Sequence, residues 1–152
     1  MDKAILISIN PKWVAKILKG EKTLEIRKTM PKCDLPIDVY IYCTLKDLTN
    51  DEYIMKGLPI SSRGKVVAKF TLNKIDKIHL RFEKYCAGEL SQDGLLKYAC
   101  LTEQELDNYL WSNRCIGYAW HIDNLEIFDR PKPLQPFFDL DRPPQSWCYI
   151  EV

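Results

Sequence analysis

The chain has 152 residues, of which 46% are hydrophobic and 28% are charged, and this length suits one domain that buries about two-thirds of its unfolded surface. Lys and Arg total 22 against 21 Asp and Glu, so the formal net charge is +1. Because a near-neutral surface releases few counterions, the composition disfavours a non-specific duplex binder, and any nucleic-acid contact must come from a local cluster within the single domain 1–152.

The N-terminal residues predict a buried strand followed by a short helix. Residues 4–9 form an apolar, β-branched run that is typical of a buried strand. Asn10 can cap the helix, Pro11 can occupy its first position, and Gly20 ends it.

A compact charged motif follows this helix. Gly20, Lys22, Glu25 and Arg27 are spaced as G-x-K-x-x-E-x-R. Residues 23–27 alternate in the manner of a strand, so Glu25 and Arg27 share one polar face, and Lys22 lies in the turn before them. Arg27 can bind a phosphate or carbonyl oxygen as a planar fork, Lys22 supplies a mobile charge, and Glu25 can accept a base N–H or act as general base. The structural alternative is an ion pair between Glu25 and Arg27 on a solvated strand face.

The middle of the chain predicts two strands and a helical insertion. Residues 39–43 and 65–73 have strand character, and we expect the second to lie at the centre of a barrel. Residues 45–63 carry mixed charges and predict an irregular surface excursion. Residues 79–111 have a helical pattern, with a capping-box signature at 102–105. We expect this insertion either to act as a lid or to cover a barrel mouth.

The C-terminal part returns to strands. Residues 115–120 and 124–128 have strand character, and residues 147–152 predict a final strand. Between them, residues 130–144 contain five prolines, which predict an extended strap without regular structure. Strands dominate both ends with helices between them, without the regular alternation of a doubly wound fold, so we expect an α+β barrel.

The cysteines and the N-terminus indicate a reduced cellular compartment. Six cysteines are scattered without a C-x-x-C pair or a histidine at zinc-ligand spacing. His121 and Asp123 share a strand face but lack further ligands, so we expect no metal and no cofactor. No signal peptide or membrane-length apolar run is found, so we expect a cytoplasmic protein without membrane association.

The charged motif and its setting resemble the ASCH domain family, a branch of the PUA-like superfold that is associated with RNA. Over residues 4–27, the predicted order of strand, helix, turn and strand is similar to that of the family. The resemblance implies a PUA-like mixed β-barrel with short flanking helices and a helical insertion. It also implies that Lys22, Glu25 and Arg27 line a cleft that contacts RNA.

Four further residues are candidates for this ligand site. Tyr118 and Trp120 alternate along one predicted strand and could stack on a base, which contributes about 1–3 kcal/mol per base. Packing in the core is the alternative for both. Ser8 and Asn10, at the end of the first strand, could donate or accept hydrogen bonds at the ligand, or could make capping and turn bonds instead.

The resemblance leaves several functions open. Some small bacterial members look like amidohydrolases that act on acetylated cytidine, and another resembles a ribonuclease. The catalytic Lys of the amidohydrolase branch maps onto Lys22, but Glu25 stands where that branch has its Thr. We therefore predict that the chain binds RNA, a nucleotide or a modified nucleoside. Hydrolysis of an acylated nucleoside or of RNA by Lys22 and Glu25 is the alternative, and a protein-interaction module that docks partners through 130–144 and the helices around Leu106 is another.

Overall fold

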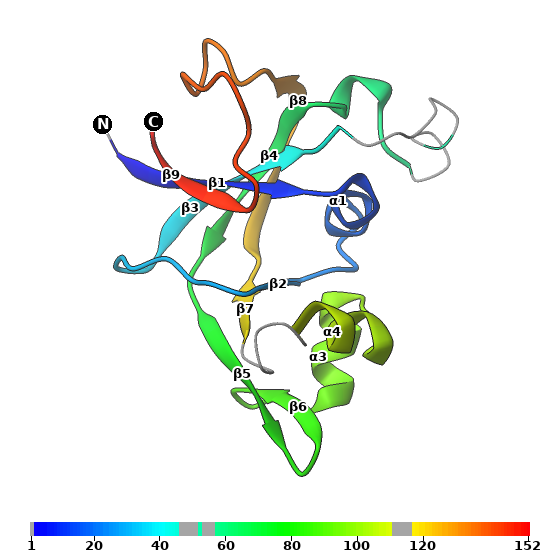
Figure 1. Ribbon diagram of the computed structural model, residues 1–152. Coiled ribbons are helices and arrows are strands. Elements are labelled where there is room, and N and C mark those ends of the chain that lie inside the picture. Colours follow the sequence, from blue (N-terminus) through cyan, green and yellow to red (C-terminus); the bar gives the residue numbers. More distant parts are fainter. Residues whose placement is uncertain (1, 46–51, 53–56, 111–116) are drawn as a thin grey trace. The chain divides into compact units, whose positions relative to one another are not determined.

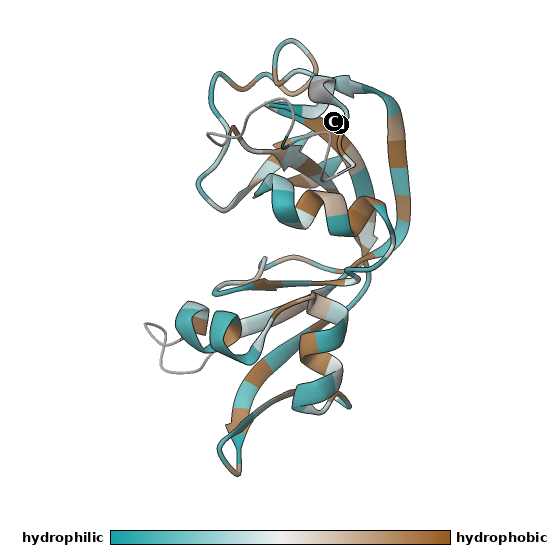
Figure 2. Ribbon diagram, turned by 90° about the vertical axis from the view of Figure 1, so that its right-hand side faces the viewer, coloured by the Kyte–Doolittle hydropathy of each residue, from teal (hydrophilic) through white to brown (hydrophobic). Residues whose placement is uncertain are grey.

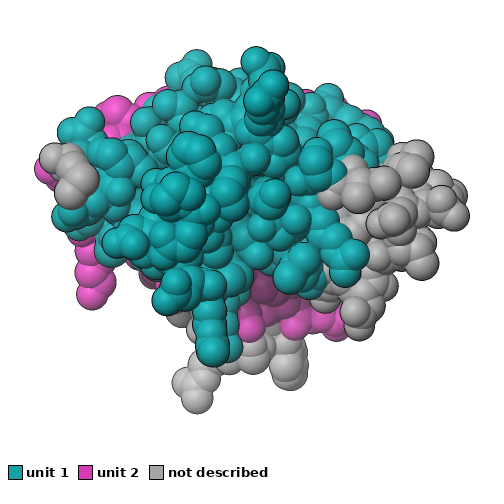
Figure 3. All heavy atoms as spheres, turned by 90° about the horizontal axis from the view of Figure 1, so that it is seen from above, with its two compact units in different colours: residues 1–19, 37–71, 124–152 teal, residues 20–36, 72–123 magenta. Residues whose placement is uncertain are grey.

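The computed structural model in Figure 1 describes residues 2–45, 52, 57–110 and 117–152. The chain forms two compact units, each assembled from separate stretches of the sequence (Figure 3). Unit 1 comprises Met1–Lys19, Ile37–Thr71 and Asn124–Val152, and unit 2 comprises Gly20–Pro36 and Leu72–Asp123. The single domain over 1–152 stays a prediction.

Unit 1 is built on a five-stranded sheet with the order β8-β4-β3-β1-β9. β1 (Lys3–Ile9) pairs in parallel with β3 (Ile37–Cys43) and antiparallel with β9 (Trp147–Glu151). The remaining strands are β4 (Lys65–Leu72) and β8 (Asp123–Lys132). We expected the strand at 65–73 to be central, but β3 holds the middle of this sheet because β8 pairs outside β4.

The predicted strand and helix at the N-terminus are confirmed. β1 is buried along six of its seven residues, as its continuous apolar run indicates. α1 (Pro11–Leu18) begins with proline at its first position. The Asn10 side chain makes no capping bond, and its Oδ1 instead accepts a hydrogen bond from Thr44 Oγ1 at 3.1 Å. Gly20 follows the helix with a φ of +78°, a conformation that glycine adopts without strain.

The proline-rich segment is more regular than expected. β8 continues through Pro131 to Lys132, although we expected extended coil from residue 130 onward. β8 is an edge strand, where the missing N–H of a proline need not interrupt the ladder. Beyond it, Leu134 and Phe138 are buried in a hydrophobic cluster with residues of β1, β3, β4 and β9. The segment is therefore packed against the sheet of unit 1, to which it belongs.

Unit 2 is built on a four-stranded sheet with the order β2-β7-β5-β6, and its strand pairs run antiparallel. The strands are β2 (Leu24–Arg27), β7 (Gly117–His121), β5 (Ile75–Arg81) and β6 (Lys84–Ala87). Two helices, α3 (Gln92–Ala99) and α4 (Glu103–Leu110), accompany the sheet (Figure 1). One face of the sheet shares a core with them, consisting of Leu24, Ile26, Ile78, Tyr85, Ala87, Leu95, Ala99, Leu106, Leu110 and Ala119. By strand alternation, Glu25 and Arg27 belong to the opposite face.

The helical prediction over 79–111 is wrong at its beginning. Residues 75–87 form the β5–β6 hairpin, and over 78–83 hydrophobic and hydrophilic residues alternate (Figure 2). Ile78, Tyr85 and Ala87 face the core, so a period of two fixes this segment as strands. Helix begins only at Gln92. Trp111, the predicted end, lies outside the described residues.

The expected α+β class is confirmed. The described residues contain nine strands in two sheets, three α-helices and the 3-10 helix η1 (Ile60–Ser62). The two sheets are not closed into a barrel. The predicted PUA-like barrel is therefore unconfirmed. Much of the predicted excursion at 45–63, and Cys115, lie outside the described residues. Within the part that is described, no helix combines the length and apolar character needed to cross a membrane.

The capping box predicted at 102–105 is confirmed and gives a test of the fold. Glu105 N donates to Thr102 Oγ1 at 3.1 Å, and Thr102 N donates to Glu105 Oε1 at 3.0 Å. Thr102→Ala leaves the Glu105 N–H without this partner, so we expect the free energy of unfolding to fall by about 1 kcal/mol in urea titrations. Thr102→Ser keeps the hydroxyl and is the matched control. Equal stability of the Ala variant and the wild type would contradict the capping role.

Candidate functional site

The charged motif lies in unit 2, in the turn before β2 and along the strand itself. β2 is the edge strand of its sheet and pairs with β7, with Glu25 opposite Trp120 and Arg27 opposite Tyr118. The predicted alternation is observed, because Leu24 and Ile26 enter the core shared with α3 and α4. Glu25, between them, and Arg27, after Ile26, are therefore held on the other face by the packing of their neighbours.

Lys22 is held against the end of a helix. Its side chain is 2% exposed, and Nζ donates to the backbone oxygen of Ala99, the last residue of α3, at 2.6 Å. Thr23 N donates to the neighbouring Tyr98 oxygen at 2.9 Å. Carbonyl groups at a helix C-terminus carry partial negative charge and favour a cation. Lys22 and Thr23 therefore fix the turn before β2 to α3.

Burial changes the proton affinity of this lysine. Removal from water lowers the pKa of Lys22 from its ordinary value of 10.5, because burial penalises the charged ammonium. The nearby carboxylate of Glu25 opposes the shift, since it favours the charged form, but burial has the larger effect. A lysine with a lowered pKa is more readily a neutral amine, which can accept a proton.

Glu25 lies between two cations and is almost completely buried. Oε1 is 3.8 Å from Lys22 Nζ, and Oε2 is 3.8 Å from Arg27 Nη2. Oε1 also accepts a hydrogen bond from Ile26 N at 3.2 Å. The structural ion pair of Glu25 with Arg27 is thus present, but both side chains are largely buried, with exposures of 8% and 11%, and not on a solvated strand face.

One atom of this arrangement has no hydrogen bond within the described part of the chain. Glu25 Oε2 is inaccessible to solvent, and no donor among the described residues reaches it. Leaving a buried acceptor unsatisfied costs about 1–3 kcal/mol, and more for a charged group. Ionised carboxylate oxygens are strong acceptors, so Oε2 would accept an N–H or O–H group from outside the chain once the side chains that cover it are displaced.

Tyr109 of α4 joins the site and was not identified from the sequence. Tyr109 is 37% exposed, and its partial burial raises the pKa of its hydroxyl, while the charges of Arg27 and Glu25 act on that pKa in opposite directions. The Lys28 backbone hydrogen-bonds the tyrosine oxygen, and Lys28 Nζ lies 5.0 Å from the ring centroid. A Cβ at Gly117 of β7 would lie 2.6 Å from Leu110 Cδ2, so a larger residue there would displace the side chain that follows Tyr109. In the sequence, Tyr109 belongs to the apolar stripe of a predicted helix, and no sequence pattern indicates that this helix contacts the charged motif.

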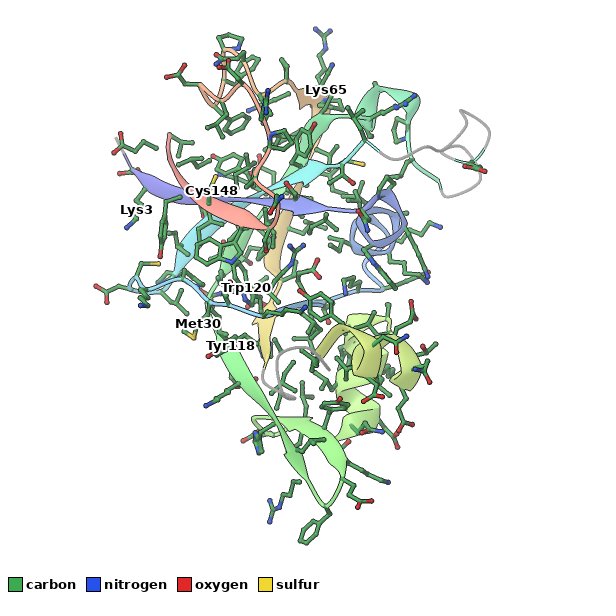
Figure 4. The ribbon with its side chains drawn as sticks, viewed as in Figure 1. Lys3, Met30, Lys65, Tyr118, Trp120 and Cys148 are labelled. Atoms are coloured by element: carbon green, nitrogen blue, oxygen red, sulfur yellow. The ribbon has the colours of Figure 1, made fainter. Side chains whose placement is uncertain are left out.

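The two aromatic candidates lie on β7, as labelled in Figure 4. Trp120 is fully buried, and its Nε1 donates to the Thr29 oxygen at 3.3 Å, which agrees with the alternative of core packing. Tyr118 is half-buried and lies in register with Arg27. Tyr118 is thus the aromatic residue that the sheet aligns with the charged motif. Base stacking by either residue stays a prediction.

Ser8 and Asn10 belong to unit 1 and have hydrogen-bond partners in the same unit. Ser8 Oγ donates to the Pro144 oxygen at 2.6 Å, and Asn10 accepts the bond from Thr44. Neither is the capping or turn bond that the sequence left open as the alternative, because the partners lie 136 and 34 residues away along the chain. A role for Ser8 and Asn10 in ligand binding stays a prediction.

The weak metal candidate has other partners. His121 Nε2 lies 2.7 Å from Asp76 Oδ2, and Asp123 Oδ2 accepts from Asn73 Nδ2 at 3.3 Å. Among the residues that the structure describes, no group of three or more His, Cys, Asp or Glu side chains is placed to hold a metal ion. The five described cysteines, Cys33, Cys43, Cys86, Cys100 and Cys148, are free thiols.

The lowered pKa of Lys22 predicts a pH-dependent contribution to stability. Between the folded pKa and the ordinary 10.5, the unfolded chain binds more protons than the folded protein, so stability rises with pH. We expect the wild type to gain stability relative to Lys22→Met across this interval and no further gain above it. Urea titrations from neutral pH upward measure the difference, with Lys97→Met on the exposed side of α3 as the control. Parallel curves for the wild type and Lys22→Met would refute the shift.

Comparison with known proteins identifies the fold. The sequence matches no protein-family model and no curated protein. Among solved structures it is similar to ASCH from Zymomonas mobilis, with a TM-score of 0.64 and 21% identity over 97% of this chain and 87% of that one. For a tyrosine-to-phenylalanine variant of that protein, the TM-score is 0.63 and the identity is 21%, over 99% of this chain and 91% of the variant. For a serine-to-alanine variant, the TM-score is 0.65 and the identity is 20%, over 97% of this chain and 88% of the variant. The chain therefore has the fold of these ASCH structures, as the charged motif predicted.

Proposed function

We propose that the protein binds RNA or a nucleotide through Lys22, Glu25 and Arg27. The observation that carries this proposal is the buried Oε2 of Glu25, which has no hydrogen bond among the described residues. Nucleobases and modified nucleosides present N–H donors of the kind that such an oxygen accepts. A base N–H bound to Oε2, with the side chains that cover this atom displaced, would satisfy an acceptor that has no hydrogen bond among the described residues.

The charges around Glu25 support a ligand that also carries a phosphate. Two cations flank one carboxylate at 3.8 Å, so the local charge is positive although the whole chain is near neutral. The planar guanidinium of Arg27 matches the geometry of phosphate oxygens. Tyr118, opposite Arg27 on β7, is suitably aligned for stacking on the base. Base and phosphate would thus be bound by neighbouring groups on the same two strands.

The ASCH fold supports this proposal. The charged motif resembles the ASCH family, and that family is associated with RNA. The partner we propose is RNA, a nucleotide or a modified nucleoside, and the location we propose is the cytoplasm. Binding to a protein is less well supported. Leu106 is fully buried, and Leu134 and Phe138 of the proline-rich segment are buried as well. These side chains contribute to cores and are not available for docking.

A hydrolase is the second candidate, and the lowered pKa of Lys22 favours it. An amine that loses its proton more readily could act as general base toward a water molecule, with Glu25 at 3.8 Å to balance the charge that develops. The attacked bond would be the amide of an acylated nucleoside or a phosphodiester of RNA. Lys22 also fixes the turn to Ala99, so its replacement affects both structure and chemistry.

Arg27→Gln tests the binding proposal. It removes a charge-assisted contact without a large change in volume, so we expect affinity for a responsive nucleotide or short RNA to fall by about tenfold or more. Titration of nucleoside monophosphates and short oligonucleotides by calorimetry or fluorescence anisotropy measures the change. Lys32→Gln, an exposed charge change in unit 2, is the control, and melting curves verify folding. If Arg27→Gln binds every ligand as well as the wild type does, the proposed site is wrong.

Release of acetate from an acetylated nucleoside tests the hydrolase candidate. We expect turnover by the wild type to fall by at least about 100-fold in Lys22→Met and Glu25→Gln, the size of effect typical of a lost general base. Glu25→Asp keeps the charge and is the matched control for folding. A wild type that binds acylated nucleosides and RNA without converting them would leave binding as the function.

A further inference from the structure

The turn of the β5–β6 hairpin has a backbone conformation that its sequence does not favour. Arg81 pairs with Lys84, so Phe82 and Glu83 are the two residues of the loop. Their φ values are +52° and +64°. Positive φ at both positions is the type I′ turn, in which Asn-Gly is preferred and a bulky aromatic residue is strained.

Burial does not compensate for this strain. Phe82 is 89% exposed, the largest value among the exposed large hydrophobic residues of the described chain. Its only ring contact among the described residues is with the preceding Arg81, whose guanidinium carbon lies 5.8 Å from the ring centroid. An exposed aromatic ring on a strained turn contributes little to folding. Backbone strain that packing does not explain is found mainly at functional sites.

Basic residues line the hairpin next to this ring, and three of them are Lys or Arg. Lys77, His79 and Arg81 alternate along β5, and Lys84 lies opposite Arg81 on β6. All four are exposed and belong to the face opposite Ile78, Tyr85 and Ala87, which are buried in the core of unit 2. Lys77, Arg81 and Lys84 form no ion pair with any described residue. Glu83 is the only acidic residue from 77 to 86.

The same face of the sheet continues to the candidate site. Lys77 is in register with Tyr118 of β7, and Tyr118 is in register with Arg27 of β2. Adjacent strands lie about 4.8 Å apart, so these three residues form a short row across the sheet. A polyanion that contacts Arg27 could therefore extend along Lys77 and Arg81 toward Phe82 without leaving unit 2.

We infer that the outer face of the β5–β6 hairpin, formed by Lys77, Arg81, Lys84 and Phe82, is a contact surface for single-stranded RNA. The cations bind successive phosphates, and Phe82 stacks on an unpaired base. This inference rests on the proposed function and extends the bound ligand from one nucleotide to a strand. A single strand fits better than a duplex, because stacking on Phe82 requires an unpaired base and the whole chain is near neutral.

Two sets of variants separate stacking from charge. The probe is a fluorescein-labelled oligouridine of about 12 nucleotides, titrated at several salt concentrations. We expect Phe82→Ala to weaken binding by about tenfold with little change in the salt dependence of binding. Phe82→Trp keeps an aromatic ring and should bind with the affinity of the wild type. The triple variant Lys77→Gln, Arg81→Gln, Lys84→Gln should reduce the slope of log K against log salt by about 2, because three phosphate contacts are lost.

Phe82→Asn tests whether the strain serves binding. Asn tolerates the left-handed conformation, so we expect a higher melting temperature together with weaker binding of the oligouridine. A loss of affinity then cannot be attributed to unfolding. Phe137→Ala, at a residue of unit 1 that is 58% exposed, is the control for an exposed phenylalanine and should bind as the wild type does.

Parallel titrations of Arg27→Gln and of uridine monophosphate distinguish this inference from the proposed function. If the hairpin variants bind the oligouridine as the wild type does while Arg27→Gln does not, the hairpin surface is wrong and the proposed function stands. The same conclusion follows if the wild type binds the mononucleotide but no oligonucleotide. Binding of neither ligand overturns both. Binding to phosphatidylserine vesicles that depends on the hairpin cations, with no RNA binding, would identify a membrane partner and overturn the inference.

Discussion

The contact between Lys22 and the end of α3 is the constraint on which the candidate site depends. An ammonium removed from water requires partners, and Lys22 finds them in the Ala99 oxygen and the Glu25 carboxylate. Arg27 then approaches the same carboxylate from the other side. Because removal of one partner would leave the others buried and uncompensated, the three charges are held as a group. The position of β2 relative to α3 is therefore fixed by charge interactions as well as by the shared apolar core.

This arrangement gives the same residues a structural and a recognition role. Lys22 anchors a turn, whereas Glu25 keeps one oxygen without a hydrogen bond in the described chain. Well-packed ion groups usually satisfy all their acceptors, since an unsatisfied one is costly. Leu24 and Ile26 fix the strand by burial, so Glu25 and Arg27 cannot simply rotate to another face. The site is thus pre-organised by the packing of its apolar neighbours.

Local patterns predicted the elements that local forces determine. The alternation around Glu25, the proline at the start of α1 and the capping box at Thr102 depend on residues a few positions apart, and each was confirmed. The β5–β6 hairpin was missed because its turn residues, Phe82 and Glu83, lack the Asn or Gly that marks a type I′ turn. Tyr109 was missed because its approach to Lys28 depends on contacts between α4 and β2, which no sequence spacing reveals.

The pairing of β2 with β7 has a consequence for how the protein folds. The charged motif lies near the start of the chain, but its strand partner, Gly117–His121, is among the later elements. A contact between distant segments must overcome the entropy of closing a long loop, and such contacts slow folding. During synthesis, the motif emerges well before the strand and helix that bury it. Lys22, Glu25 and Arg27 therefore stay hydrated until α3 and β7 have been synthesised, and the site is completed only when unit 2 closes around them.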